Sequence, residues 1–211
     1  MKMRHLLPFA IVALAGLSLG AGCPTVPRLE DRVVELALGS STTLTLLAYG
    51  DVNTLDDAGT ENLATDIDLN AILNGAGVDI ADVTGIKLSG ISYRVTVPDP
   101  IPGRSISATT VTAQRGVAAP VALISSFGQN VSAASSWTTA PLSGAGVVLI
   151  NGLLADILAG AKAHPPTTPA NPSLTYHIMG TSNPTGATTN FTWQLRLDLS
   201  IAGTIKVKVL N

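Results

Sequence analysis

The 211-residue sequence predicts a mainly β fold, either an antiparallel β-sandwich or a strongly curved sheet, with one packed helix. The clearest sign is the stretch from Phe191 to Val209, where apolar and polar residues alternate. Such alternation places one face of a strand in a core and the other in water, as in antiparallel sheets. Charged residues make up only 12% of the chain, while threonine, valine and glycine are frequent, which suits strands and turns.

The alternation at 191–209 describes either one long strand or two strands that break near Ala202 and Gly203. In the earlier strand over 86–97 the apolar positions shift by one residue at Ser89 and Gly90, which predicts a β-bulge. Residues 50–62 are polar and acidic, and we expect a loop there. The other expected strands cover residues 33–38, 42–49, 104–114, 121–127 and 174–178.

Two segments have helical periodicity. In residues 142–161 apolar side chains recur at steps of three and four, so the pattern predicts an amphipathic helix with Ser143 as its N-cap. Asn151 and Asp156 are expected on its opposite, polar side. A short helix is predicted over 66–74, where an aspartate caps the N-terminus and a glycine ends the helix.

The N-terminus has the layout of a secretory signal. Lys2 and Arg4 precede an apolar run from Leu6 to Leu19, and small residues then lead to Cys23, the single cysteine. We therefore divide the chain into a signal peptide over 1–22, a tether over 23–32 and one β-rich domain over 33–211.

Small residues before a lone cysteine make this segment resemble the lipobox of bacterial lipoproteins, although Gly20 stands where that family prefers leucine. The resemblance implies cleavage before Cys23, its fatty acylation and attachment to the cell envelope. Pro24 instead of aspartate after the cysteine implies sorting to the outer membrane. A plain secretory signal cleaved near Ala21 or Gly22 is the alternative, and a retained anchor is disfavoured because a membrane span needs about 20 residues.

The sequence indicates no enzyme, cofactor or nucleic-acid partner. The formal net charge is −2, and no basic stripe with interleaved aromatic residues is present, which argues against nucleic acid. No nucleophile elbow, phosphate-binding loop, dinucleotide fingerprint or zinc-protease motif occurs. His164 and His177 lack a neighbouring carboxylate pattern and make a weak metal pair.

Two further features leave alternatives open. Asp51, Asp56, Asp57 and Glu61 form either a loose calcium site or a solvated acidic segment, and Leu55 at the fifth position excludes an EF-hand loop. Trp137, in a Ser/Thr-rich stretch, is either exposed and adhesive or packed against a sheet edge, whereas Trp193 is expected in the core.

These observations favour a non-catalytic, membrane-anchored envelope lipoprotein that acts as a structural or binding module. Its expected partners are the membrane, through the N-terminal lipid, and another envelope protein. The alternative is a carrier of lipid or another apolar ligand, with the helix over 142–161 as a lid above a cavity.

Overall fold

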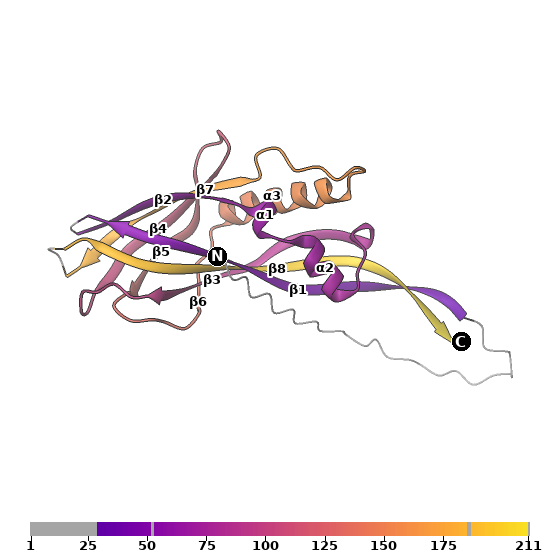
Figure 1. Ribbon diagram of the computed structural model, residues 1–211, viewed down its shortest axis with the longest axis horizontal. Helices are drawn as coiled ribbons and strands as arrows, with labels where there is room; N and C mark the ends of the chain where they lie inside the picture. The colour runs from indigo at the N-terminus through magenta and orange to yellow at the C-terminus, as the bar shows by residue number, and fades with distance from the viewer. Residues whose placement is uncertain (1–28, 52, 185–186, 211) are drawn as a thin grey trace.

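The computed structural model describes residues 29–51, 53–184 and 187–210, and it confirms a mainly β fold. Two four-stranded antiparallel sheets pack as a sandwich, with one long helix and a shorter one beside them (Figure 1). In spatial order, the first sheet contains β1 (Leu29–Gly50), β8 (Thr189–Leu210), β3 (Val83–Val97) and β6 (Thr138–Thr139), and the second contains β2 (Thr54–Asn62), β7 (Ser173–Asn183), β4 (Ser105–Arg115) and β5 (Val121–Asn130).

The first sheet is built on one long pair of strands. β1 and β8 have 22 residues each and pair without a register shift from Leu29 opposite Leu210 to Gly50 opposite Thr189. The C-terminal alternation is therefore one strand, and the two strands expected at 33–38 and 42–49 are also one. β1 begins at Leu29, inside the range predicted as a tether. Gly203 does not break β8, since it pairs with Leu36 of β1 and with Val83 of β3. Its missing side chain lets the main chain of Asp82 approach closely.

Alternate residues of β8 form the centre of the core, as the sequence pattern predicts. Trp193 is 1% exposed and contacts Tyr93 of β3, with ring centroids 5.2 Å apart. Phe127 of β5, in the other sheet, stacks on Trp193 at 5.6 Å and lies 4.9 Å from Tyr93. This aromatic cluster joins the two sheets.

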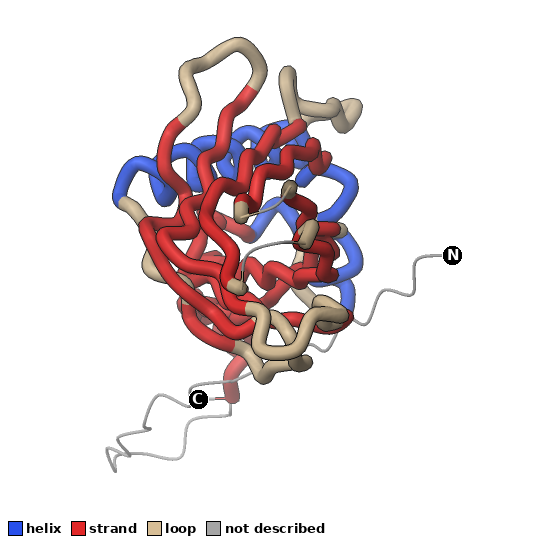
Figure 2. The backbone as a smooth tube through the Cα atoms, turned by 90° about the vertical axis from the view of Figure 1, so that its left-hand side faces the viewer, coloured by secondary structure: helices blue, strands red, loops and turns tan. Residues whose placement is uncertain are grey.

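The first sheet is longer than the second, and helices cover the remainder (Figure 1). Figure 2 shows the strands curving around a common interior with the helices along one side. The long helix α3 (Gly144–Lys162) packs on β3 and β5, and its inward residues Ile150, Leu153 and Leu154 are fully buried. α3 thus supplies to one part of the sheet the apolar layer that the second sheet supplies elsewhere.

Polar contacts cap the start of α3 and hold the helix against β3. The predicted cap is confirmed, because the Ser143 hydroxyl accepts a hydrogen bond from the Gly146 amide at 2.9 Å. Asn151, expected on the outer side, instead faces β3 and accepts a hydrogen bond from the Leu88 amide at 2.7 Å. Leu88 adjoins the predicted bulge, which a register shift between Leu88 and Gly90 confirms. The Asn151 side chain therefore accepts a hydrogen bond from a main-chain amide of β3 that does not pair with β6.

α3 is also long and apolar enough, by length and composition, to cross a membrane. It is the one described helix that passes this test. Seven of its residues are nevertheless buried within the protein, including Ile157 and Leu158. This burial is what the sequence predicts for a helix that covers a core.

One local expectation is wrong, and the bounds of another shift by a few residues. The segment expected as a loop over 50–62 contains β2, an edge strand paired with β7. Its alternation is hidden because the half-buried positions after Leu55 hold Asp57, Gly59 and Glu61. The helix expected at 66–74 is α2 (Leu69–Ala76), capped by Asp68 and ended by Gly77 at φ 67°, with a separate turn α1 (Leu63–Asp66) before it.

Two glycines of α3 test whether close packing holds this helix in place. A Cβ on Gly146 would lie 2.7 Å from the Leu123 Cα in β5, whereas Gly152 has open space around it. We expect Gly146→Ala to lower the unfolding free energy by about 1–3 kcal/mol through overpacking. Gly152→Ala should raise it by about 0.5–1 kcal/mol, because alanine favours the helix. Urea denaturation measures both, and equal effects would contradict the packing described here.

Candidate functional site

The residue with the clearest predicted role, Cys23, lies outside the described residues, together with the predicted signal peptide. Within the described residues, three features of the sandwich could have a function. They are the acidic strand β2, a buried polar network and a surface cluster around Trp137.

The acidic residues considered for calcium are spread along β2 and the turn before it. Asp56 and Asp57 are neighbours in a strand, so their side chains leave opposite faces. Asp56 binds His177 of β7, with Oδ1 and Nε2 2.5 Å apart, while the Asp57 carboxylate accepts a hydrogen bond from the Ala58 amide. Asp51 lies in the turn before β2. The 2.9 Å hydrogen bond of Asp57 connects it only with the next residue, Ala58. Across the described part of the chain, no three His, Cys, Asp or Glu side chains form a metal-binding group.

The His177–Asp56 pair lies on the outer face of the second sheet and is exposed, at 41% and 68% for the two side chains. Exposed pairs of this kind are screened by water and contribute little to stability. On the other face of the same strands, Tyr176 lies over Gly59, where a Cβ would come within 2.3 Å of the phenol oxygen. Burial, with the negative charges of Asp57 and Glu61, raises the pKa of Tyr176 to about 12. Burial likewise raises the pKa of Tyr93. These phenols stay neutral and have structural roles.

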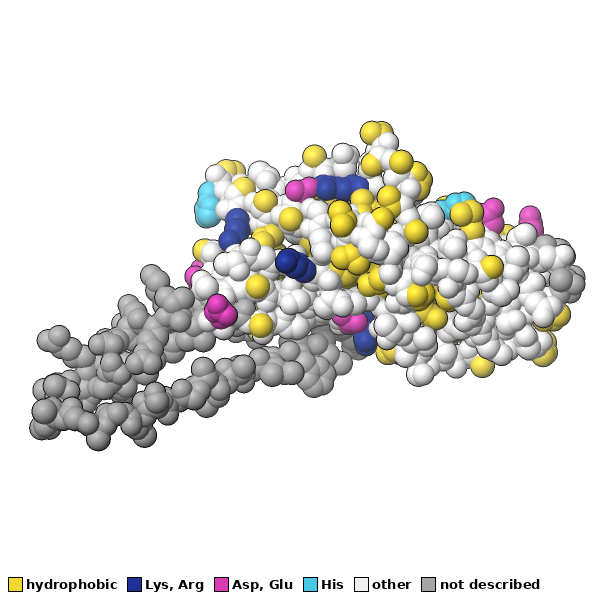
Figure 3. All heavy atoms as spheres, turned by 180° about the vertical axis from the view of Figure 1, so that it is seen from behind, with side chains coloured by type: hydrophobic (Ala, Val, Ile, Leu, Met, Phe, Trp, Pro, Cys, Tyr) yellow, Lys and Arg dark blue, Asp and Glu magenta, His cyan; other side chains and the backbone are white. Residues whose placement is uncertain are grey.

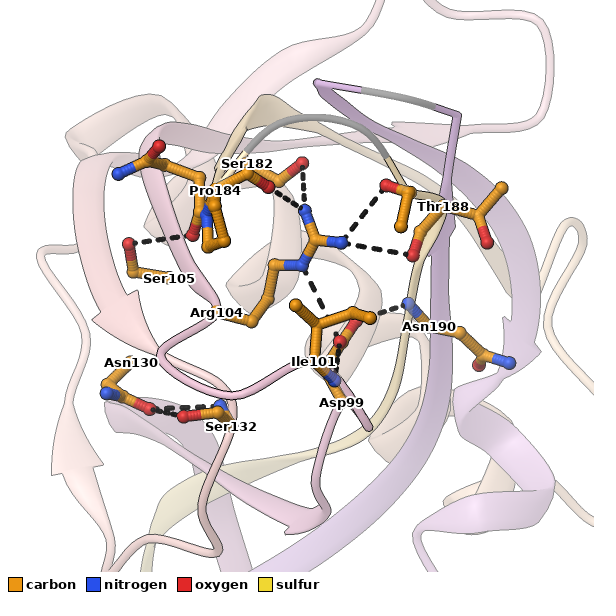
Figure 4. A network of polar contacts seen from close by, with 12 residues as sticks. Asp99, Ile101, Arg104, Ser105, Asn130, Ser132, Ser182, Pro184, Thr188 and Asn190 are labelled. Atoms are coloured by element: carbon orange, nitrogen blue, oxygen red, sulfur yellow. Dashed lines mark hydrogen bonds and ion pairs between the residues drawn. The ribbon is translucent and has the colours of Figure 1, made fainter.

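A fully buried arginine forms the densest polar network (Figure 4). Arg104 is 0% exposed, precedes β4, and pairs with Asp99 at 3.5 Å between Nε and Oδ1. Its two terminal nitrogens donate to the Ser182 hydroxyl and to main-chain carbonyls of Pro184, Ala187 and Thr188.

Asp99 is satisfied in a similar way. Its carboxylate accepts hydrogen bonds from the amides of Ile101 at 2.9 Å and Asn190 at 2.8 Å. The pair therefore ties the β3–β4 turn to the end of β7 and the start of β8. The sequence marks only a proline-rich turn at this point, and the partners lie some eighty residues further along the chain. The terminal nitrogens of Arg104 and the carboxylate of Asp99 find their partners within the protein, and Arg104 Nε lies beside Asp99 without a hydrogen bond. We assign this buried pair a structural role.

The second cluster is on the outer face of the first sheet. Trp137 is half-buried, and its ring lies against two guanidinium groups, Arg94 at 4.5 Å and Arg196 at 4.8 Å. Each cation–π contact contributes about 0.5–1 kcal/mol at an accessible site. Arg196 also pairs with Asp198 at 3.0 Å, and Arg94 donates through Nε to Gln194 at 2.9 Å. Trp137 is thus packed against the sheet, the second of the alternatives open from the sequence.

Local pairing holds Trp137 in this position. β6 follows it directly and pairs with Ser92 and Tyr93 of β3. Before it, Ser135 exchanges two hydrogen bonds with Val95, one through its amide and one through its hydroxyl. The sequence shows both arginines only as polar positions of alternating strands, so the cluster could not be seen before the register was known.

The structure also has a surface hollow of about 230 Å³ between the short helices, the end of α3 and residues 167–169. Apolar side chains such as Ile67 and Ile157 share its wall with Asp68, Asn70 and Thr168. It is open to solvent and as polar as it is apolar. The molecular face in Figure 3 carries few charged side chains, and hydrophobic atoms gather along its middle.

Comparisons with known proteins add little to these observations. No protein-family description matches the chain, and no curated protein matches it. A solved structure from Desmodium yellow mottle tymovirus is similar over 97% of both chains, at 15% identity and a TM-score of 0.35. A similarity at this level carries no argument about function.

Removing the buried carboxylate of Asp99 should lower the unfolding free energy more than removing an exposed carboxylate. We expect Asp99→Asn to lower the unfolding free energy by about 3–5 kcal/mol, because the Arg104 charge is left without a counterion in the core. Asp156, which pairs with Arg115 at 2.7 Å but is 53% exposed, is the matched control. Asp156→Asn should cost less than about 1 kcal/mol. Chemical denaturation compares the two, and similar losses would refute a structural role for the Asp99–Arg104 pair.

Proposed function

We propose that the protein is a non-catalytic, membrane-anchored binding module of the cell envelope. The observation that carries this proposal is the N-terminal sequence, a charged, apolar and small-residue signal that ends at the single cysteine, Cys23. Acyl chains hold a protein to a bilayer with about 0.8 kcal/mol per buried methylene, so several chains give stable attachment.

The position of β1 supports an anchor at this residue. β1 begins at Leu29, and an extended chain covers at most about 3.5 Å per residue, so an acylated Cys23 would hold the start of this strand within about 20 Å of the lipid. Pro24, where some lipoproteins have aspartate, supports an outer-membrane location. The folded part would then bind through its surface.

The alternative, a carrier of an apolar ligand, has less support. A lid needs a cavity beneath it, and the inward side of α3 is packed against β3 and β5 instead. Gly146 is in such close contact with Leu123 that even a methyl group would collide. The hollow beside the end of α3 is open and half polar, unlike the mostly apolar clefts that enclose small ligands.

Substitution of Cys23 tests the anchor. We expect Cys23→Ser to shift the protein from the membrane fraction to the soluble envelope fraction, because serine cannot receive the thioether-linked lipid. Pro24→Asp serves as the control: it should remain acylated and stay in membranes but move away from the outer membrane. Mass spectrometry of the N-terminal peptide reads the modification directly. An unmodified thiol on protein isolated from cells would disprove the anchor.

A further inference from the structure

We propose that the Arg94–Trp137–Arg196 cluster, on the outer face of β3 and β8, binds a carboxylated sugar of an acidic polysaccharide. The inference rests on the proposed binding role and names the ligand class for it. It starts from a local imbalance of charge. Two guanidinium groups lie against one indole, and the cluster contains a single carboxylate, that of Asp198.

Arg94 is the group available for a ligand. Among the described residues only its Nε has a hydrogen-bond partner, Gln194, while its two terminal nitrogens have none. Trp137 and Gln194 together hold the guanidinium, so little side-chain freedom remains to be lost on binding. A planar guanidinium with free terminal nitrogens binds a carboxylate through two parallel hydrogen bonds.

The charge of the cluster favours a carboxylate over a phosphate. Arg94 and Arg196 against Asp198 leave one uncompensated positive charge, which one carboxylate neutralises. A phosphate monoester carries a charge closer to −2 at neutral pH and would leave an excess of negative charge beside Asp198.

The surroundings favour a sugar over a peptide. Thr43 and Thr45 of β1 are exposed and stand opposite Arg196 and Gln194 of β8, so hydroxyl groups border the cluster on that side. Such groups exchange hydrogen bonds with sugar hydroxyls. β8 lies between β1 and β3, and beside Arg94 the outer edge of β3 is occupied by β6 and Ser135, so the main-chain groups of both strands are already paired there. A peptide that adds to a sheet by strand pairing needs a free edge, which β3 and β8 lack at the cluster.

The binding partner used in the test is trigalacturonate, and its fully methyl-esterified form is the matched neutral ligand. Affinities are measured by calorimetry on the mature protein purified from cells in detergent micelles, at low and high salt. We expect the acid to bind and the ester not to bind. Arg94→Gln should weaken binding about tenfold or more, the loss expected when a charge-assisted hydrogen-bond pair is removed.

Two further variants separate the site from general electrostatics and from misfolding. Lys87, exposed on the same face and opposite Ser200, is the charge control, and Lys87→Gln should change the affinity by less than about twofold. Asp198→Asn removes the competing carboxylate and should strengthen binding by more than about twofold. A gain in affinity cannot come from loss of folding.

The proposal is overturned if the wild-type protein does not bind trigalacturonate, if the ester binds as well as the acid, or if Arg94→Gln and Lys87→Gln weaken binding equally. Triglutamate binding as tightly as trigalacturonate would identify an acidic peptide instead, and would also overturn it. Membrane fractionation of Arg94→Gln keeps the two proposals apart. This variant should remain in the membrane, so a failure of sugar binding with an intact anchor counts against the sugar site alone.

Discussion

The unbroken pairing of β1 with β8 sets the architecture of the whole molecule. These strands run side by side for 22 residues, so their sheet presents an apolar face longer than the 9–11-residue strands of the second sheet can cover. An uncovered apolar face would be costly in water. α3 covers part of this sheet by packing on β3. Asn151 accepts a hydrogen bond from the Leu88 amide of β3, and Gly146 permits close approach to β5.

This constraint also explains which elements could be predicted from the sequence. β8 and α3 each have one buried side along their length, so the periods of two and of three to four residues are visible in the sequence. β2 is an edge strand in which only Leu55 is deeply buried, and its remaining inward positions hold Asp57, Gly59 and Glu61. Its strand character comes from pairing with β7, and the local sequence does not record that pairing.

The two polar clusters, around Arg104 and around Trp137, could not be predicted from the sequence for a related reason. Asp99 and Arg104 flank one turn, but the carbonyls that satisfy Arg104 follow β7. Trp137 meets Arg196 only because β6 joins the edge of β3 and β3 pairs with β8. Register decides both contacts, and a pattern of alternation fixes which face a residue occupies without fixing its neighbours across the sheet. Candidates drawn from one segment, such as the acids of β2, were visible in the sequence, yet neighbouring strand positions point them apart.

Arg104 and Arg94 show how burial separates a structural arginine from one that remains available to a ligand. Arg104 is fully buried, its terminal nitrogens donate to protein acceptors and its Nε faces Asp99, so a ligand cannot reach it. Arg94 lies against Trp137 on a face that solvent reaches, and no described residue bonds its terminal nitrogens. The same type of side chain therefore has a different role in each environment. A charge that is accessible and only partly paired keeps most of its affinity for a second anion.

The long strands set the distance between this face and the proposed anchor. Leu29 is at one end of β1, and Thr45, opposite Gln194, is sixteen residues further along the strand. At about 3.3 Å per residue, the cluster lies about 50 Å from the end that follows Cys23. Figure 1 shows the end of the β1–β8 pair near the C-terminus extending past the helices. A lipid attached there would leave the Trp137 face far beyond the headgroups, where a polysaccharide can reach it and where the charge of the membrane surface is screened within about 10 Å. The long β1–β8 pair thus also separates the proposed attachment point from the proposed binding face.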